Sequence, residues 1–409
     1  MTNDFEQLGA ASCFIGRLEE RSITKVTDIQ RKIIPPLAEG ESIFFSSATG
    51  TGKTFAYLLP LLSRLLIEKT ERSLPRLLII APTLELCSQI SAELDFLLKE
   101  TDLHSSLLIG SVNIERQIEN LKKTKPDIIV GNPNRLVVLA KKRIIKFNNL
   151  QSLVLDEADR LVSDEMISDT SELCKIILQE TKKADIKLII TACSATMNKK
   201  YREKLFSICG RTIPFVESED NEILREKIEH WAIFSEKRKK DQALRSLLAA
   251  IKTNKKGKAG KKKIKALVFT SRGDEASLIL SRLQYHHVPS AGLFGKAGKK
   301  TLSSAERKAA LETFRQGSVD ALISTDLAAR GLDIPGITHV IALDVPSDSE
   351  VYIHRCGRTG RAGKRGIMVT IGDETQMRLL AVMEKKLKIR VQPKEMYYGK
   401  VCDPIIDEE

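Results

Sequence analysis

The sequence predicts an α/β protein with two tandem domains, each a mostly parallel sheet with helices on both faces. Three observations support this fold class. Short apolar runs alternate with stretches of helical length, the alternation occurs in both halves of the chain, and an acidic, aperiodic segment separates the halves. The length of 409 residues allows two or three domains. With 42% apolar and 29% charged residues, the composition excludes a fibrous or disordered chain.

The first half contains six apolar runs with the length of buried strands. Turn or charged residues bound these runs, which cover residues 42–47, 76–82, 105–110, 127–132, 152–158 and 187–195. Between them, residues 55–69 and 85–100 have the length and period of helices. Strands and helices that alternate at this spacing predict a parallel sheet covered on both faces.

The second half repeats this pattern. Its predicted strands cover residues 265–272, 320–326, 339–345 and 366–372. Residues 214–228 are polar and acidic and lack a strong period, which is typical of a linker. We therefore predict a first domain at residues 1–216, a linker at 217–228 and a second domain at 229–409.

The net charge of +13 is unevenly distributed along the chain. Residues 1–220 hold 30 basic and 30 acidic side chains, whereas residues 221–409 hold 36 and 23. An excess of this kind predicts a polyanionic partner and favours nucleic acid. Residues 252–265 contain eight lysines and are expected to form a surface loop. This loop can bind phosphates or simply be solvated, and the sequence leaves both interpretations open.

Several properties bear on location and assembly. No apolar run reaches the length of about 18 residues that spans a bilayer, so no membrane segment is expected. The first residues are acidic rather than basic, unlike a secretory signal, and the seven cysteines form no CxxC pair. These features favour a reducing, cytoplasmic location. No heptad pattern is present, which favours a monomer.

The segment ATGTGKT at residues 48–54 carries the strongest chemical signal. It follows a predicted strand and opens a predicted helix, where backbone N–H groups can surround a triphosphate. Ala48 stands where this motif usually has its first glycine. Lys53 is expected to neutralise phosphate charge, and the Thr54 hydroxyl to hold Mg²⁺. The full set of predicted phosphate-loop residues is Ser47, Ala48, Thr49, Gly50, Thr51, Gly52, Lys53 and Thr54.

Acidic residues follow the predicted strand at 152–158. Asp156 and Glu157 stand at its carboxyl end, where ligands bind in parallel sheets. We expect Asp156 to hold Mg²⁺, directly or through water, and Glu157 to polarise the attacking water. The sequence therefore predicts a nucleoside triphosphatase that uses Mg²⁺.

Three further motifs resemble those of one family. DEAD at 156–159, SAT at 194–196 and HRCGRTGRAG at 354–363 resemble the DEAD-box ATP-dependent RNA helicases, in the family's order and at its usual separations. The resemblance covers almost the whole chain. It implies two RecA-like domains that hydrolyse ATP when stimulated by RNA, and that unwind RNA duplexes or remodel RNA–protein complexes as the domains close. The partner it implies is a single-stranded RNA segment held by its backbone.

The resemblance also implies roles for individual residues. Gln30 would read adenine, Phe5 would lie near the base, and Asp333 would bind the ribose. Arg358 and Arg361 would reach the γ-phosphate and complete the catalytic set of Lys53, Thr54, Asp156 and Glu157. Coupling between ATP and RNA would involve Asp159, Ser194, Ala195, Thr196 and His354. The implied RNA-binding residues are Pro82, Thr83, Gly110, Asn132, Pro133, Arg135, Thr270, Arg272, Arg307 and Thr325.

Two other functions remain compatible with the sequence. A DNA helicase of the same superfamily would need the same ATP motifs, because the contact with the 2′-hydroxyl that separates RNA from DNA is not visible in a sequence. An ATP-gated RNA clamp with little unwinding activity would also share these residues. A pseudoenzyme is disfavoured, since no catalytic position is missing.

Overall fold

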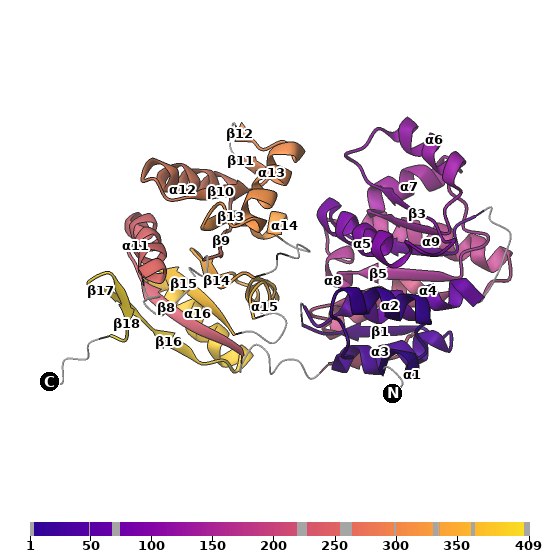
Figure 1. The fold of residues 1–409 in the computed structure, drawn as a ribbon, viewed down its shortest axis with the longest axis horizontal. Helices are drawn as coiled ribbons and strands as arrows, with labels where there is room; N and C mark the ends of the chain where they lie inside the picture. The colour runs from indigo at the N-terminus through magenta and orange to yellow at the C-terminus, as the bar shows by residue number, and fades with distance from the viewer. Residues whose placement is uncertain are drawn as a thin grey trace. The chain divides into compact units, whose positions relative to one another are not determined.

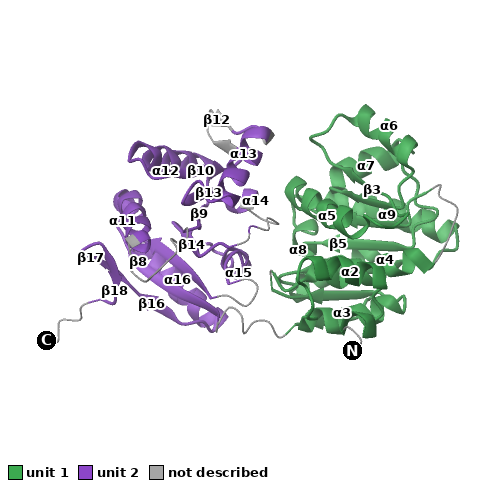
Figure 2. Cartoon of the chain, in the orientation of Figure 1, with its two compact units in different colours: residues 1–219 green, residues 220–409 purple. Residues whose placement is uncertain are grey.

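The computed structural model describes residues 4–48, 50–67, 74–218, 227–253, 264–297, 300–329, 334, 336–360 and 365–404. The chain divides into two compact units, residues 1–219 and 220–409 (Figure 2). Each unit contains one seven-stranded sheet, and every strand pair described within these two sheets is parallel. The predicted fold class is therefore confirmed.

The first unit has the strand order β3-β4-β2-β5-β6-β1-β7 (Figure 1). Its strands are β1 (Ile43–Ser46), β2 (Leu77–Ile80), β3 (Ser105–Leu108), β4 (Ile128–Gly131), β5 (Ser152–Asp156), β6 (Ile189–Ser194) and β7 (Phe215–Glu217). The six strands predicted for this half are all present. β7 pairs with β1 and was not predicted; Glu217 lies in it, so the sheet extends into the range assigned to the linker.

Helices cover both faces of this sheet, because alternate strand residues point into two separate apolar clusters. Ile79 belongs to one cluster and Leu78 to the other. The first cluster includes residues of α1 (Asp4–Gln7), α2 (Ser12–Glu20), α3 (Asp28–Ala38), α4 (Lys53–Ile67) and α5 (Leu84–Leu97). The second includes residues of α6 (Ile114–Thr124), α7 (Pro133–Lys141), α8 (Ala158–Leu161), α9 (Ile167–Lys183) and α10 (Lys199–Cys209).

The second unit has the strand order β10-β13-β9-β14-β15-β8-β16. Its strands are β8 (Ile228–Phe234), β9 (Ala266–Thr270), β10 (Ser290–Leu293), β13 (Ala321–Thr325), β14 (His339–Ala342), β15 (Gly366–Gly372) and β16 (Val391–Pro393). β11 (Lys296–Ala297) pairs with β12 (Lys300–Thr301), and β17 (Glu395–Tyr397) pairs with β18 (Lys400–Cys402), both antiparallel. The four strands predicted for this half are confirmed, whereas β8, β10 and β16 were not predicted.

The second sheet is also buried on both faces. Residues of α13 (Ser304–Arg315), α14 (Asp326–Ala329), α15 (Ser349–Cys356) and α16 (Glu374–Leu387) join one apolar cluster, and residues of α11 (Lys240–Thr253) and α12 (Gly273–Tyr285) join the other. A single turn of 3-10 helix, η2 (Lys237–Lys239), precedes α11. The lysine-rich segment expected to form a surface loop lies mostly outside the described residues.

Candidate active site and RNA-binding edge

The strand order of the first unit brings the ATP motifs together. β6 lies between β5 and β1, with Asp156 opposite Cys193 and Ser46 opposite Ser194. Because the strands are parallel, their carboxyl ends meet at one edge of the sheet. The phosphate loop, the DEAD segment and the SAT segment therefore leave three neighbouring strands at the same edge.

The phosphate loop connects β1 to α4. Gly50 and Gly52 have φ angles of 82° and 88°, a backbone conformation that favours glycine. The Lys53 ammonium donates to the Ser47 and Ala48 carbonyl oxygens at 2.7 and 2.8 Å, and a hydrogen bond of 2.6 Å joins the Ser47 and Thr51 hydroxyls. The loop thus places the Lys53 ammonium beside the amino end of α4, where backbone N–H groups and the helix dipole favour an anion. Thr49 lies outside the described residues.

Gln30 contacts this loop rather than the surface. Its side-chain nitrogen donates to the Gly52 carbonyl at 3.2 Å, and its side-chain oxygen accepts from the Thr27 amide at 3.0 Å. Only 2% of Gln30 is exposed. Phe5 is likewise fully buried, within the apolar cluster beneath α2. The structure does not display either side chain for contact with a base, and their roles in adenine binding stay predictions.

Asp156 is held by three hydrogen bonds. Its Oδ1 accepts from the Glu157 amide at 2.8 Å and from the Cys193 thiol at 3.2 Å, and its Oδ2 accepts from the Tyr57 hydroxyl at 2.9 Å. Glu157 itself has left-handed backbone angles, φ 47° and ψ 53°. Such strain in a non-glycine residue costs about 1–3 kcal/mol and clusters at functional sites. The geometry is consistent with the expected roles of both carboxylates.

Tyr57 and Cys193 were not predicted as site residues. Tyr57 lies one helical turn after Thr54, and Cys193 immediately precedes the SAT motif, so both positions could have been found by following the motifs inward. Burial raises the pKa of Tyr57 well above its ordinary value; the nearby charges of Asp156 and Cys193 and a hydrogen bond to Asp156 add to this rise, and a hydrogen bond with Thr54 opposes it. Burial also raises the pKa of the Cys193 thiol, and Asp156 adds to that rise.

The residues at this edge suit Mg²⁺ chemically. Thr54 and Asp156 offer hydroxyl and carboxylate oxygens, the ligand types that Mg²⁺ prefers. Among the described residues, no group of three or more His, Cys, Asp or Glu side chains is arranged to hold a metal ion. Mg²⁺ typically binds through one or two protein groups together with substrate phosphates and waters, so a sparse set of this kind fits.

The predicted coupling residues of the first unit are in contact. The Thr196 hydroxyl donates to Asp159 Oδ2 at 3.2 Å, and the Thr196 amide donates to the Ser194 hydroxyl at 3.4 Å. Asp159 is only 8% exposed. Ala195 stands between the two contacting residues. The DEAD and SAT segments are thus joined directly by a side-chain hydrogen bond, between Thr196 and Asp159.

The predicted RNA motifs of the first unit follow β2, β3 and β4, which neighbour one another. The Arg135 guanidinium donates to the carbonyls of Gly110 and Val112, each at 3.0 Å, and so joins two of these motifs. The Thr83 hydroxyl oxygen caps α5 by accepting from the Leu86 amide at 3.2 Å, after Pro82. Asn132 and Pro133 open α7. These residues lie at the same edge of the sheet as the ATP motifs, but they follow β3, β4 and β2, whereas the ATP motifs follow β5, β6 and β1.

The predicted RNA residues of the second unit are less uniform. Thr270 is fully buried, and its hydroxyl donates to the Arg272 carbonyl at 3.0 Å; its role in RNA binding stays a prediction. The exposed Arg272 side chain pairs with Asp274, with an Nε to Oδ1 distance of 3.0 Å. Thr325 ends β13 and Arg307 lies on α13, both half-buried.

His354 and Arg358 lie close together near the end of α15. Arg358 Nε donates to the His354 carbonyl at 3.2 Å. Both residues are buried, with 4% of Arg358 and 8% of His354 exposed. The predicted residues Asp333 and Arg361 lie outside the described residues.

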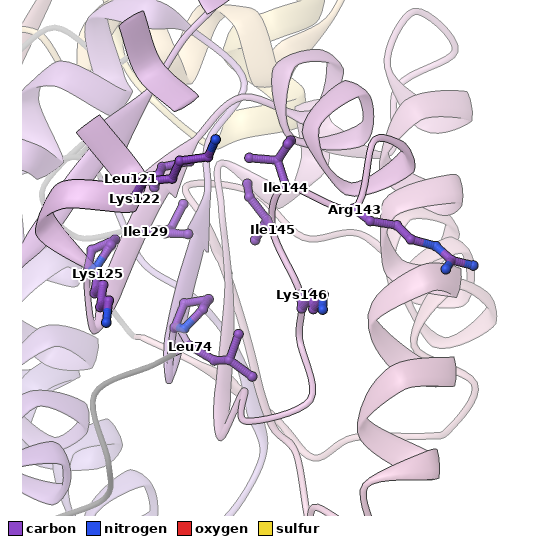
Figure 3. A pocket seen from close by; sticks show the side chains of 11 residues that line it. Leu74, Leu121, Lys122, Lys125, Ile129, Arg143, Ile144, Ile145 and Lys146 are labelled. Carbon is purple, nitrogen blue, oxygen red and sulfur yellow. The ribbon is translucent and has the colours of Figure 1, made fainter. Parts of the chain in front are cut away.

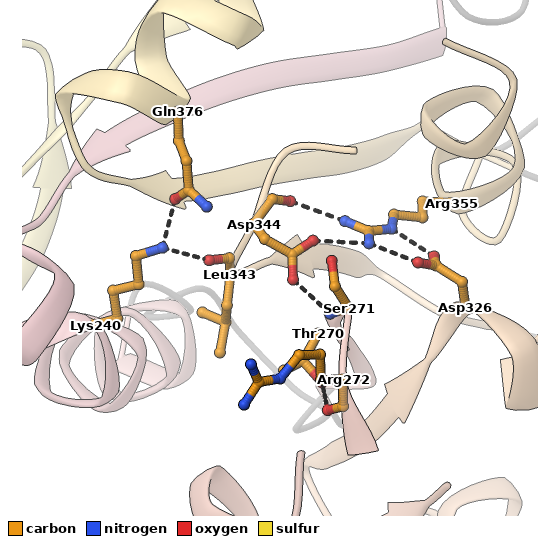
Figure 4. A network of polar contacts seen from close by, with 9 residues as sticks. All are labelled: Lys240, Thr270, Ser271, Arg272, Asp326, Leu343, Asp344, Arg355 and Gln376. Carbon is orange, nitrogen blue, oxygen red and sulfur yellow. Dashed lines mark hydrogen bonds and ion pairs between the residues drawn. The ribbon is translucent and has the colours of Figure 1, made fainter. Parts of the chain in front are cut away.

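A buried ion network around Arg355 was missed by the sequence analysis (Figure 4). Arg355 binds Asp326 through Nε and Nη2 at 2.6 and 2.7 Å, and Asp344 through Nη2 at 2.8 Å. The other Asp344 oxygen accepts from the Ser271 amide at 2.5 Å. Burial lowers the pKa of Arg355, but hydrogen bonds with the two carboxylates and their charges outweigh it and raise that pKa above its ordinary value. The network fixes the segments that follow β9, β13 and β14.

One cavity of the first unit lies away from these motifs (Figure 3). It has a volume of about 360 Å³ and is lined by Lys122, Lys125, Arg143 and Lys146 around apolar residues that include Ile129. Ile129 belongs to β4 near its amino end, opposite the edge that carries the ATP motifs. Within the described residues, no helix is long and apolar enough to cross a membrane.

The phosphate loop and the carboxylate on a nearby strand define a nucleoside triphosphatase of the P-loop class. Comparisons agree with this class. Residues 27–204 match the family model of the DEAD/DEAH box helicases, and residues 239–363 match the helicase conserved C-terminal domain. The chain is 32% identical to the DEAD-box ATP-dependent RNA helicase CshC of Bacillus cereus, over 93% of this chain and 90% of the relative. It is also 32% identical to the probable ATP-dependent RNA helicase YfmL of Bacillus subtilis, over 98% and 99% of the two chains.

Solved structures show the same fold. Mss116p bound to ssRNA and AMP-PNP has a TM-score of 0.83 and 25% identity, covering 96% of this chain and 78% of that one. S. cerevisiae Dbp5 bound to RNA and ADP BeF3 has a TM-score of 0.82 and 23% identity, covering 96% and 95%. The chain belongs to the DEAD-box ATP-dependent RNA helicases. The predicted family, its RecA-like fold and its ATP-hydrolysing helicase activity are thereby confirmed.

Proposed function

We propose that this helicase binds ATP at the edge formed by β1, β6 and β5 and binds single-stranded RNA by its backbone at the edge formed by β2, β4 and β3. The observation that carries the proposal is the strand register, which puts Asp156 opposite Cys193 and Ser46 opposite Ser194. This register brings together chain segments that are about a hundred residues apart in the sequence.

Each protein group has a distinct task in this proposal. Lys53 and the loop amides bind the phosphates, Thr54 and Asp156 hold Mg²⁺, and Glu157 orients the attacking water. Mg²⁺, when bound, neutralises charge on the phosphates. Arg358 and Arg361 of the second unit stabilise charge that develops on the γ-phosphate, so ATP and RNA each favour closure of the two units. Each ligand should then tighten the binding of the other by the same factor.

The cysteines and the names of the relatives support the proposed location and the proposed nucleic-acid partner. All seven cysteines are free thiols, as is usual for proteins of a reducing compartment, which supports a cytoplasmic location. The relatives CshC and YfmL carry RNA helicase in their names, which supports RNA as the nucleic acid. Stimulation of ATP hydrolysis by RNA and by single-stranded DNA, compared at one salt concentration, tests this choice.

The substitution Glu157→Gln tests the catalytic assignment. It keeps the size of the side chain but removes the charge that orients water. We expect RNA-stimulated ATP hydrolysis to fall by about 10²-fold or more, while ATP-dependent RNA binding persists. Glu203→Gln on the exposed face of α10 is the matched control. Full hydrolysis by the Glu157 variant would show that the assignment is wrong.

A further inference from the structure

Asp156 is surrounded by donors that come from three different elements. Tyr57 reaches its Oδ2 from α4, whereas Cys193 and the Glu157 amide reach its Oδ1 from β6 and from its own segment. Tyr57 and Cys193 are both fully buried. We propose that these two side chains are positioning residues, which fix the Asp156 carboxylate in the orientation that binds Mg²⁺. This inference rests on the proposed role of Asp156 as a metal ligand.

The number of hydrogen bonds to each oxygen of Asp156 indicates which oxygen can bind a further ligand. A carboxylate oxygen has two lone pairs, and both lone pairs of Oδ1 are used by the Cys193 thiol and the Glu157 amide. Among the residues that the structure describes, Oδ2 accepts a single hydrogen bond, from Tyr57, which leaves one of its lone pairs for a ligand. Mg²⁺, or a water bound to it, would therefore be received by Oδ2, beside the Tyr57 hydroxyl.

Tyr57 also connects the two expected metal ligands. It lies three residues after Thr54, so both side chains share one face of α4. The Tyr57 hydroxyl donates to Asp156 Oδ2 at 2.9 Å. The phenol group therefore links the helix that carries Thr54 to the aspartate at the end of β5. A hydrogen bond of this kind, which orients a metal ligand from outside, typically changes metal affinity by about 10–100-fold when it is lost.

The substitution Tyr57→Phe removes one oxygen atom and retains the buried ring. The test measures binding of the non-hydrolysable analogue AMP-PNP, without RNA, while the Mg²⁺ concentration is varied. We expect the Mg²⁺ concentration at half-maximal binding to rise about tenfold, and binding to recover at saturating Mg²⁺. Tyr352→Phe is the matched control, because the Tyr352 hydroxyl is also buried but bonds to His230 Nδ1 at 3.0 Å in the second unit.

Cys193 allows an independent test of the positioning role, because it donates to Oδ1 of Asp156 rather than to Oδ2. Cys193→Ala removes the donor to Oδ1, whereas Cys193→Ser keeps a donor. We expect the alanine variant to need about threefold more Mg²⁺, a smaller effect than that of Tyr57→Phe because a thiol is a weak donor. The serine variant should restore the Mg²⁺ requirement of the unmodified protein. This pair keeps the proposal testable should Tyr57→Phe fail to fold, as judged by thermal melting.

The outcomes separate this inference from the proposed function. An unchanged or a lower Mg²⁺ requirement in a folded Tyr57→Phe variant would overturn the positioning role, as would equal effects of Cys193→Ala and Cys193→Ser. If the unmodified protein bound AMP-PNP with no dependence on Mg²⁺, the metal site itself would be refuted. A raised requirement in Tyr57→Phe and Cys193→Ala, with Tyr352→Phe and Cys193→Ser unchanged, supports the proposal.

Discussion

Arg355 offers the sharpest test of how the second unit is held together. Its guanidinium side chain is 1% exposed and binds Asp326 and Asp344, whose side chains are 24% and 12% exposed. Arg355→Ala removes the cation and leaves two carboxylates close together in a poorly solvated place. We expect a large loss of stability, since removing one member of a buried ion pair strands its partner.

The size of the loss follows from the geometry. Loss of one partner of a buried ion pair costs about 3–5 kcal/mol. Here one cation serves two carboxylates, and a carbonyl oxygen of Asp344 also accepts from Arg355 at 2.8 Å, which places the expected loss at the upper end of that range. For a domain of this size, each kcal/mol lowers the melting temperature by about 2–4 °C. The transition assigned to the second unit should therefore move down by about 10–20 °C.

Thermal melting and urea unfolding of the full chain measure this effect. The matched control is Arg378→Ala, because Arg378 pairs with Glu374 on the surface of α16, where the two side chains are 79% and 75% exposed. An exposed pair of this kind contributes about 0–1 kcal/mol, so the control should melt within a few degrees of the unmodified protein. A double variant, Arg355→Ala with Asp326→Asn, should recover part of the lost stability because one stranded charge is removed.

Two results would refute this reasoning. Equal melting of the Arg355 and Arg378 variants would mean that the buried network adds no more than a surface pair. Strictly additive effects of Arg355→Ala and Asp326→Asn would mean that the two side chains do not interact energetically. Either result would leave the segments after β9 and β13 held by packing alone.

Two further predictions concern the first unit. Gly52→Ala should weaken ATP binding about tenfold or more in a fluorescent nucleotide titration. Gly52 has φ +88°, and an added Cβ would lie 2.4 Å from Gln30 Nε2. Unchanged affinity would contradict the conclusion that the loop conformation requires glycine at this position. Burial raises the pKa of Cys209 from 9.0 to about 12, so the folded chain keeps a proton that the unfolded chain releases above pH 9. The free energy of unfolding should therefore fall as pH rises from about 9, and Cys209→Ala should make this fall shallower by up to about 1.4 kcal/mol per pH unit in urea titrations.

The sheets were predictable wherever strands consist of apolar runs. Residues 77–80 and 128–131 are buried on both faces, and such strands appear in the sequence as unbroken apolar segments. β8, with the sequence IEHWAIF, mixes buried and exposed positions and carries charged and imidazole groups, so it lacks that signal. β10, with the sequence SAGL, is a short edge strand of small residues, and its pairing with β13 depends on the fold around it.

The candidate site was predictable where its residues lie within short motifs. The phosphate loop and the DEAD segment are each contiguous, so their chemistry is visible in a few residues. Arg355 is different, because its partner Asp326 is 29 residues away and only the return of the chain through the sheet brings them together. Tyr57 meets Asp156 across 99 residues, and only its position one helical turn after Thr54 points to it in the sequence. The position of Arg355 within the motif at 354–363 does not indicate its contact with Asp326.

The order of strands in the first unit also suggests how the two proposed ligand sites influence each other. β5 carries Asp156 and lies between β2, which leads to the predicted RNA motif at Thr83, and β6, which leads to the SAT segment. The two DEAD aspartates are both tied to the chain of β6, one through Cys193 and the other through Thr196. A displacement of β6 together with the segment that follows it would therefore act on both aspartates. Only β5 separates β6 from β2, the strand that leads to the predicted RNA motif. Coupling between the proposed ATP and RNA sites would therefore need to cross only one strand. Substitutions at Thr196 should alter the stimulation of ATP hydrolysis by RNA more than they alter nucleotide affinity.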